Sequence, residues 1–420
     1  MSGSEWIART GRPAAALRRA EELGAFVETY AEPGIPAAVK DLIDVAGQPV
    51  RNGTPGLGHR IAGTDAPVWA RLRAAGYAAV ARTTVPELAW SGRTPGCGNP
   101  WDPSRDAGGS SGGSAVAVAT GATVVALGTD TGGSIRIPAA LCGVAGLRPT
   151  HDTLDLRGIT PVTPSMDTVG PIAATAADCL RLHGLLGGAI EPVPALADLT
   201  VGLPVHLWAG KCDPEVVRLV EEAAATLRAA GVKIVEVDLP LAARHARTAG
   251  YTTMLFESAR QWWAEYQRDP SGLAGRAAGL LRAGSEVSVP DYERARELAA
   301  AIRAEVDAVF GDVGALLLPT VPVTAARLDE ETVELGGRAE DVENAYYRLT
   351  ALASVGGHPA LTVPAGLSAA GLPVGAQLVG PRRQEATLCA LGTVIEDGPA
   401  ARELALARRN LQDETVRTQP

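Results

Sequence analysis

The chain of 420 residues has few cysteines, no long apolar run and few aromatic side chains. The five cysteines stand at positions 97, 142, 179, 212 and 389, and the odd count without any CxxC pair argues against a disulfide framework or a zinc site. No stretch approaches the roughly 18 consecutive apolar residues of a membrane span, and the first residues lack the apolar core of a signal peptide. We therefore expect a soluble cytoplasmic protein without a membrane partner.

The sequence also lacks an excess of positive charge. It has 38 Lys and Arg residues against 47 Asp and Glu residues, which gives a net charge of −9. A nucleic-acid-binding protein normally carries a basic patch or stripe. The densest basic stretch, around Arg12, Arg18 and Arg19, is followed at once by Glu21 and Glu22, which is typical of one solvated helix face. We expect no nucleic-acid partner.

Strand-like and helix-like segments alternate along the chain. Residues 201–239 predict a βαβ unit, 290–310 a long amphipathic helix, and 12–30 a helix with an apolar stripe. Residues 83–109 predict a long loop, and loops of that length in a compact domain are usually functional or disordered. No composition shift marks a linker and no internal repeat is present. The simplest account is one large α/β domain over residues 1–420.

Three glycine-rich or lysine-bearing stretches stand out as candidates for chemistry. They are Val39-Lys40-Asp41, the segment GGSSGGS at 108–114, and the segment GTDTGGSIRIP at 128–138. In the last of these a predicted strand ends near Leu127, and two glycines then allow a tight turn that leads to Ser134. Such a turn can direct several backbone N–H groups toward one point, which is what a developing oxyanion requires. Ser134 is therefore a candidate nucleophile.

A serine nucleophile needs a base. The six histidines offer no partner motif and no GxSxG segment is present, although a triad assembled in space stays open in principle. Lys40 is the other option, because a buried lysine can lose its charge and then accept a proton. Its neighbours from Ile35 to Val39 are apolar, and a lysine within a strand-like apolar run is unusual.

Together the three stretches resemble the amidase signature family, which uses a Ser–cis-Ser–Lys triad. The resemblance spans about residues 30–395, and the family spacing of 24 positions between the two serines is matched here, since 134 − 110 = 24. It implies Lys40 as base, Ser110 as the cis-serine that relays the proton and Ser134 as nucleophile. It also implies an oxyanion hole formed by the backbone of Thr131, Gly132, Gly133 and Ser134. The implied supporting residues are Ser111, Asp130 and Arg136, through their side chains.

The resemblance also implies a fold and a reaction. The expected fold is a single domain with a central mixed β-sheet covered by helices on both faces, a signature core over about 30–190 and a C-terminal part over about 200–400. The expected reaction is amide hydrolysis through a seryl acyl-enzyme, with no metal and no organic cofactor. Four side chains are assigned to the substrate pocket: Trp90, Trp101, Ile137 and Met166.

The expected substrate is a small primary amide with an aryl or apolar acyl part, because tryptophans fall on predicted loops and Ile137 adjoins the oxyanion turn. Two alternatives stay open: the glutaminase subunit of a tRNA-dependent amidotransferase, and a non-catalytic binding protein with the same fold. Such subunits resemble GGSIRQP at the third stretch, whereas Ile137 stands here in place of the glutamine. A homodimer is kept open as an assembly.

Overall fold

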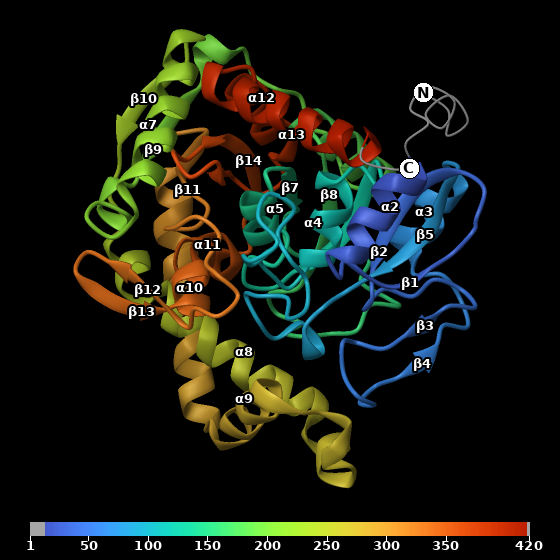
Figure 1. The fold of residues 1–420 in the computed structure, drawn as a ribbon. Coiled ribbons are helices and arrows are strands. Elements are labelled where there is room, and N and C mark those ends of the chain that lie inside the picture. Colours follow the sequence, from blue (N-terminus) through green and yellow to red (C-terminus); the bar gives the residue numbers. More distant parts are fainter. Residues whose placement is uncertain (1–12, 418–420) are drawn as a thin grey trace.

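A mixed β-sheet of eleven strands runs through the molecule (Figure 1). The computed structural model describes residues 13–417, with the side chains of residues 14–413. The strands of the sheet lie in the order β1-β5-β2-β6-β8-β7-β14-β15-β11-β9-β10. Their bounds are β1 (Phe26–Thr29), β2 (Ile35–Lys40), β5 (Tyr77–Thr83), β6 (Val125–Asp130), β7 (Ala145–Arg148), β8 (Thr168–Ala173), β9 (Thr200–Leu203), β10 (Lys233–Glu236), β11 (Ala315–Pro319), β14 (Ala360–Leu367) and β15 (Pro373–Val379).

Both parallel and antiparallel pairs occur in this sheet. Strand β2 is parallel to β5 and β6, and β9 is parallel to β10 and β11, whereas the middle of the sheet from β6 to β11 is antiparallel. Parallel strands need a crossover connection, and antiparallel neighbours do not. Helical crossovers accordingly connect the parallel neighbours. Strand β6, which leads to Ser134, lies between a parallel neighbour and an antiparallel one.

Helices cover both faces of the sheet. Successive residues of a strand point to opposite faces, so Val39 packs in one apolar cluster with α3, α6, α7 and α12, and Ala38 packs in another with α2, α4 and α5. Helices α8, α10 and α11 form a further cluster over β11, β14 and β15. The bounds are α2 (Pro13–Glu22), α3 (Pro67–Ala74), α4 (Gly112–Ala119), α5 (Arg136–Cys142), α6 (Ala176–Leu186), α7 (Pro214–Ala229), α8 (Pro240–Arg268), α9 (Gly275–Glu286), α10 (Val289–Val309), α11 (Val342–Gly356), α12 (Glu385–Glu396) and α13 (Pro399–Arg417).

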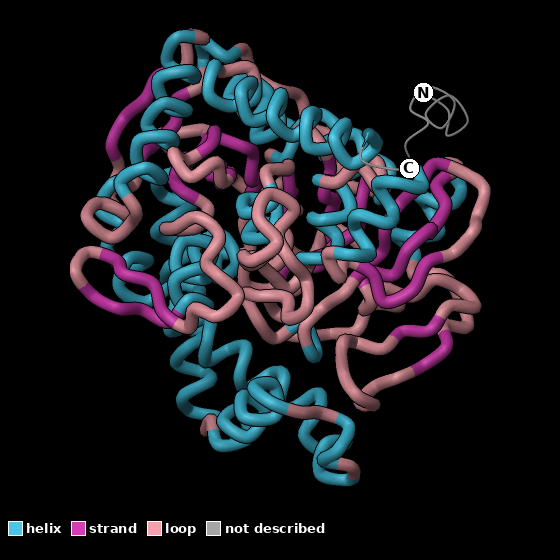
Figure 2. The backbone as a smooth tube through the Cα atoms, viewed as in Figure 1, coloured by secondary structure: helices cyan, strands magenta, loops and turns pink. Residues whose placement is uncertain are grey.

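Helices α8 and α9 extend beyond the sheet as an arm, at the bottom of Figure 1. Tyr266 and Leu281 of the arm pack against Leu57, which lies on a loop, and Leu88, which lies in the short 3-10 helix Glu87–Ala89. Two hairpins complete the fold, β3 (Pro49–Val50) with β4 (Arg60–Ile61) and β12 (Thr332–Leu335) with β13 (Arg338–Asp341). Loops gather in the middle of the face shown in Figure 2, directly above the arm.

The predicted fold class is confirmed, as are the βαβ unit, formed by β9, α7 and β10, and the long helix, formed by α10. The prediction of one helix over 12–30 is wrong. Residue 12 lies outside the described residues, and helix α2 gives way to a turn at Gly24, whose φ of 72° is in the left-handed region that favours glycine. Phe26–Thr29 then pairs with β5 at the edge of the sheet. None of the described helices has the length and apolar character needed to cross a bilayer.

Candidate active site

Ser134 lies on the turn between β6 and α5, at the wall of a narrow cleft of about 90 Å³. Thr131 and Gly132 line the same cleft, and Ser134 is partly exposed to it. The N–H of Gly133 donates to a carboxylate oxygen of Asp130 at 2.9 Å. The prediction for Gly133 as an oxyanion donor therefore needs correction, because its N–H already has an acceptor. The N–H groups of Thr131, Gly132 and Ser134 make no such bond to Asp130.

Lys40, the last residue of β2, is fully buried beside the two serine segments. Its Nζ donates to Ser110 Oγ at 2.7 Å, to Ser111 Oγ at 2.9 Å and to Thr129 Oγ1 at 2.9 Å. Burial lowers the pKa of Lys40 to about 7, against the opposing charges of Asp130 and Asp167. A lysine with this pKa is largely neutral in mildly alkaline solution and can accept a proton there.

The segment that carries Ser110 and Ser111 is joined directly to the Ser134 turn. The N–H of Ser111 donates to the carbonyl oxygen of Ser134 at 3.1 Å, and Ser111 Oγ donates to the carbonyl of Thr129 at 3.3 Å. The peptide bond between Gly109 and Ser110 is cis. Helix α4 begins immediately afterwards at Gly112. Lys40 and Ser110, which lie 70 positions apart in the sequence, thus meet in one hydrogen-bonded group with Ser111 and Thr129.

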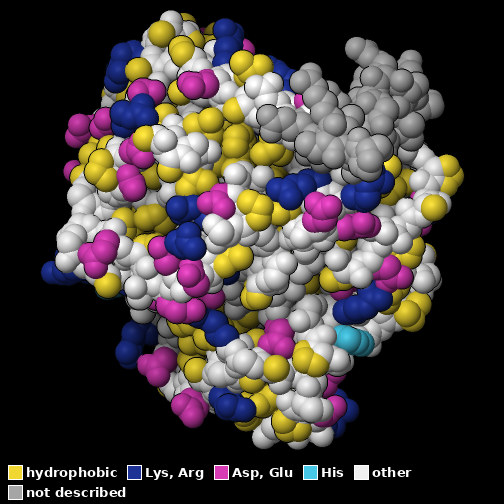
Figure 3. Space-filling view, viewed as in Figure 1, with side chains coloured by type: hydrophobic (Ala, Val, Ile, Leu, Met, Phe, Trp, Pro, Cys, Tyr) yellow, Lys and Arg dark blue, Asp and Glu magenta, His cyan; other side chains and the backbone are white. Residues whose placement is uncertain are grey.

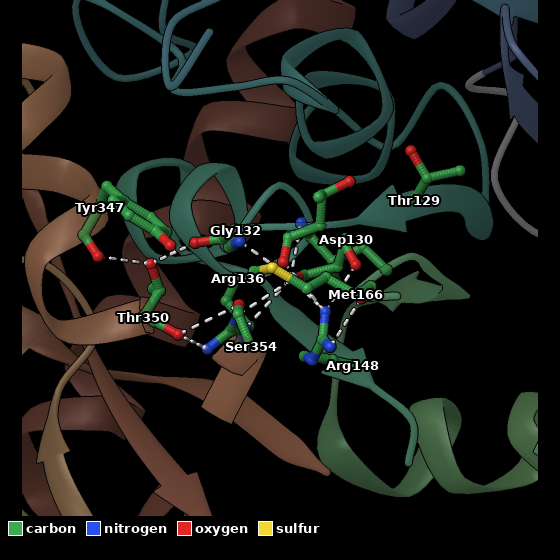
Figure 4. Close-up of polar contacts among 12 residues, drawn as sticks. Thr129, Asp130, Gly132, Arg136, Arg148, Met166, Tyr347, Thr350 and Ser354 are labelled. Carbon is green, nitrogen blue, oxygen red and sulfur yellow. Dashed lines mark hydrogen bonds and ion pairs between the residues drawn. The ribbon is translucent and has the colours of Figure 1, made fainter. Parts of the chain in front are cut away.

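Asp130 anchors the Ser134 turn and lies beside Arg136 and Arg148 (Figure 4). Its carboxylate accepts from the N–H of Ile135 at 3.1 Å, from the Arg136 guanidinium at 3.0 Å and from Arg148 at 2.9 Å. Burial alone would raise the pKa of Asp130, but the charges of Arg136 and Arg148 outweigh it and hold this pKa well below its usual range. Asp130 is therefore an anion at any working pH and fixes the shape of the turn through charge-assisted hydrogen bonds.

Arg136 connects the turn to the C-terminal part of the chain. It donates to Thr350 O at 2.9 Å and Ser354 Oγ at 2.8 Å in α11, and to Gln377 Oε1 at 2.6 Å in β15. Thr350 in turn donates to the carbonyl of Gly132. These bonds hold the turn between α11 and the sheet, so the position of Ser134 depends on residues more than 200 positions away.

A second buried carboxylate, Asp167, supports the first residue of the turn. Thr131 Oγ1 donates to Asp167 at 2.6 Å, and the N–H groups of Val162 and Thr163 donate to the other oxygen at 2.8 and 2.9 Å. Burial raises the pKa of Asp167 above its usual value, against the lowering effect of these three bonds. Arg148 reaches this segment as well, by donating to the carbonyl of Met166 at 2.8 Å (Figure 4).

The cleft beside Ser134 is mainly apolar and is built from six parts of the chain. Trp90 and Ile137 line it, as the sequence analysis expects. The remaining wall comes from Val162, from α8, from α9 and from α11, whose side chains could not be recognised because an apolar residue on a helix resembles an ordinary core residue. These helix residues are Tyr251, Met254, Leu255, Arg276, Leu280, Glu343, Asn344 and Tyr347.

Trp101 and Met166, predicted to line the pocket, lie elsewhere. The indole N–H of Trp101 donates to the carbonyl of Cys142 at 2.9 Å, at the far end of α5, which directs the ring away from Ser134. Met166 is buried in the apolar cluster of α8, α10 and α11. Both assignments are corrected here, because a tryptophan or methionine beside a glycine-rich segment can equally fill a gap in the core.

Three buried groups of the site had no role in the sequence analysis: Thr129, Arg148 and Asp167. Thr129 is the next-to-last residue of β6 and stands one position before Asp130, so a period-two reading of the strand could have placed its side chain opposite to that of Asp130. Arg148 is at the end of β7, and a fully buried arginine in a strand must have a carboxylate or carbonyl partner. The signal for Thr129 is present in the sequence, whereas that for Arg148 requires knowledge of its burial. The carboxylate of Asp167 has no comparable local signal.

The amidase family model matches residues 8–389 of the chain. The chain belongs to the amidase signature family. A glutamyl-tRNA(Gln) amidotransferase subunit from Synechococcus sp. (strain CC9605) is 34% identical over 397 residues, which cover 83% of this chain and 79% of that protein. Indoleacetamide hydrolase from Pseudomonas syringae pv. syringae is 34% identical over 390 residues, which cover 86% of this chain and 84% of the relative.

Solved structures of this family agree with the fold. A crystal structure described as an amidase is 32% identical, with a TM-score of 0.84 over 94% of this chain and 98% of the other. The peptide amidase of Stenotrophomonas maltophilia is 28% identical, with a TM-score of 0.76 over 91% of this chain and 92% of the other. With the family match over most of its length, the chain is an amide hydrolase of the amidase signature family.

Proposed function

We propose that this amide hydrolase uses Ser134 as nucleophile, Ser110 as proton relay and Lys40 as base. The observation that carries the proposal is the 2.7 Å contact between Lys40 Nζ and Ser110 Oγ in a fully buried site, with the pKa of Lys40 lowered by burial to about 7. A neutral Lys40 takes the proton of Ser110 while Ser110 takes that of Ser134, and Ser134 Oγ attacks the amide carbonyl. Ser111 and Thr129 keep the lysine in place.

The oxyanion formed by this attack is assigned to the free N–H groups of the turn. Gly133 donates to Asp130, so the donors proposed are Thr131, Gly132 and Ser134. One such donor is typically worth about 3–4 kcal/mol of barrier. When the intermediate collapses, the leaving nitrogen receives a proton back through Ser110 and departs as ammonia. Water then hydrolyses the acyl-enzyme by the same relay.

The substrate proposed is a small primary amide with an aryl or apolar acyl part. The cleft beside Ser134 is narrow, and Trp90, Ile137 and Met254 give it apolar walls, which favours a flat or branched apolar group over a flexible polar one. The relative from Pseudomonas syringae, whose name is indoleacetamide hydrolase, supports the same substrate class.

A panel of primary amides tests the substrate class, with ammonia release as the readout. It contains phenylacetamide and indoleacetamide, the aliphatic propionamide, the charged malonamate and glutamine. The proposal predicts the highest kcat/KM for the two aryl amides. A preference of tenfold or more for malonamate or glutamine over phenylacetamide would contradict it.

A second candidate is the glutaminase subunit of a tRNA-dependent amidotransferase. The observation in its favour is the 34% identity to the Synechococcus amidotransferase protein, which equals the identity to indoleacetamide hydrolase. Against it, the charged groups that line the cleft are Arg276 and Glu343, which lie 3.3 Å apart and neutralise each other. Glutaminase activity that appears only with the other amidotransferase subunits would establish this candidate.

A further inference from the structure

A second cavity, of about 580 Å³, lies on the outer side of helices α8 and α11 and shares no lining residue with the cleft at Ser134. Its walls come from the start of α8, the middle of α11, the β12–β13 hairpin and the loop around residue 210 (Figure 1). Its floor is apolar, formed by Leu207, Ala242, Ala246, Leu349 and Leu352.

The charged residues that line this cavity are five cations and one anion. The cations are Lys211, Arg244, Arg247, Arg338 and Arg348, and the anion is Glu340. The excess is four positive charges in one concavity of a chain whose net charge is −9. On the face shown in Figure 3, Lys and Arg side chains are interspersed with Asp and Glu side chains. Such a local excess is not a consequence of the overall composition.

The carboxylate of Glu340, which lines the cavity, already pairs with two arginines. Arg247 donates to Glu340 Oε1 at 2.9 Å, and Arg348 pairs with the other oxygen of the same carboxylate. Arg348 also donates to the carbonyl of Lys211 at 2.8 Å. Burial and the charge of Arg247 lower the pKa of Arg348, against the raising effect of Cys212. One anionic partner therefore serves two guanidinium groups.

The side chains of the two other arginines of the cavity have no partner among residues 13–417. Arg244 on α8 and Arg338 on β13 are exposed, and neither side chain makes a hydrogen bond or an ion pair within the part of the chain that the structure describes. On the hairpin Arg338 and Glu340 are two positions apart and so share one face, which is the face toward the cavity. Two guanidinium groups are thus held at the rim of a cationic cavity and are free to bind a ligand.

We propose that this cavity binds a small phosphate-bearing molecule with two or more negative charges. Guanidinium groups bind phosphate oxygens through paired hydrogen bonds. The excess of four positive charges matches a diphosphate better than a single carboxylate, and the concave shape favours a small molecule over an extended polymer. The apolar floor would cover the organic part of the ligand. The proposal does not depend on the substrate of the cleft.

Inorganic pyrophosphate is the probe for the test, titrated calorimetrically into the full chain against sodium chloride of equal ionic strength. We expect saturable binding at one site. In the double variant Arg244→Gln/Arg338→Gln the affinity should fall about tenfold, because two charge-assisted contacts are lost. The matched control is Arg228→Gln/Arg268→Gln, which removes two exposed arginines that also lack a partner in the described residues and lie outside the cavity. It should bind pyrophosphate as the wild type does.

Three results would overturn the proposal. The first is the absence of saturable heat with the wild-type chain at matched ionic strength, and the second is an equal loss of affinity in both double variants. The third is binding of a long polyanion such as heparin without binding of pyrophosphate, since that would assign the surface to a macromolecule. Circular dichroism and a melting curve of each variant establish that a lost affinity does not arise from unfolding.

Discussion

Replacing Lys40 by methionine removes a buried charge while keeping a side chain of similar length. Each pKa unit corresponds to about 1.4 kcal/mol. The lowering of the pKa of Lys40 from 10.5 to about 7 therefore corresponds to a free energy of about 5 kcal/mol against the charged form in the folded protein. The variant also loses the hydrogen bonds of Nζ to Ser110, Ser111 and Thr129, at about 1 kcal/mol each.

The pH dependence of stability follows from these values. Below about pH 7 Lys40 is charged in both the folded and the unfolded chain, so the stability of the folded protein is lowered by the full free energy of burying that charge. Between about pH 7 and 10.5 only the unfolded chain is charged, and the stability of the wild type rises with pH. Above pH 10.5 Lys40 is neutral in both states, so a buried charge no longer lowers the stability. The stability of Lys40→Met relative to the wild type should therefore increase as pH falls from 10 to 7 and stay constant below that.

Urea denaturation at pH 6, 7, 8, 9 and 10 measures this difference. We expect it to change by about 1.4 kcal/mol per pH unit between pH 10 and 8. Lys233→Met is the matched control, because Lys233 is exposed on β10 and its side chain makes no interaction within the described residues. A difference between Lys40→Met and the wild type that is independent of pH would refute a lowered lysine pKa. Amide hydrolysis by Lys40→Met should be lost at every pH.

Three further predictions concern residues around the site. Thr129→Val removes one hydrogen-bond acceptor of Lys40 Nζ, so the charged form of the lysine is less stabilised and its pKa falls further. The acid limb of the kcat/KM profile should therefore move to lower pH, and an unmoved limb would contradict this contact. Arg148→Met leaves the buried Asp130 with one arginine and should lower the free energy of unfolding by about 3 kcal/mol, measured in urea, whereas a loss below about 1 kcal/mol would count against the cluster. Trp90→Ala should raise KM for phenylacetamide with little change for propionamide, and equal effects on both would remove Trp90 from the acyl pocket.

Much of the site was predictable because its chemistry is concentrated in short segments. The lysine in an apolar run and the two serine segments are each local signals, and the structure brings Lys40, Ser110, Ser111 and Asp130 into one buried group. The sequence could not show which backbone N–H groups of the Ser134 turn already have an acceptor within the protein. Gly133 is a plausible oxyanion donor by position, and only the three-dimensional contact with Asp130 excludes it.

The substrate pocket was predicted less well, and the reason is geometric. Trp101 and Met166 lie close to the signature in sequence, yet the indole of Trp101 bonds to the carbonyl of Cys142 and the side chain of Met166 is buried in the core. Tyr251 and Leu280 lie more than 100 positions after Ser134 and reach the cleft because α8 and α9 fold back over it. The edge strand Phe26–Thr29 shows the same limit of prediction for the fold. The apolar residues of this segment have a helix-like spacing, but its pairing with β5 makes it a strand.

The central claim is that Ser134 is the nucleophile and that Lys40 activates it through Ser110. Labelling with a fluorophosphonate, followed by mass spectrometry of the digested protein, tests this claim most directly. The account predicts a single label on Ser134, no label in Ser134→Ala, and labelling slowed at least 100-fold in Lys40→Met and Ser110→Ala, since proton transfer by a positioned group contributes roughly 10²–10⁴-fold. A label on another residue, or amide hydrolysis by Ser134→Ala at the wild-type rate, would contradict it.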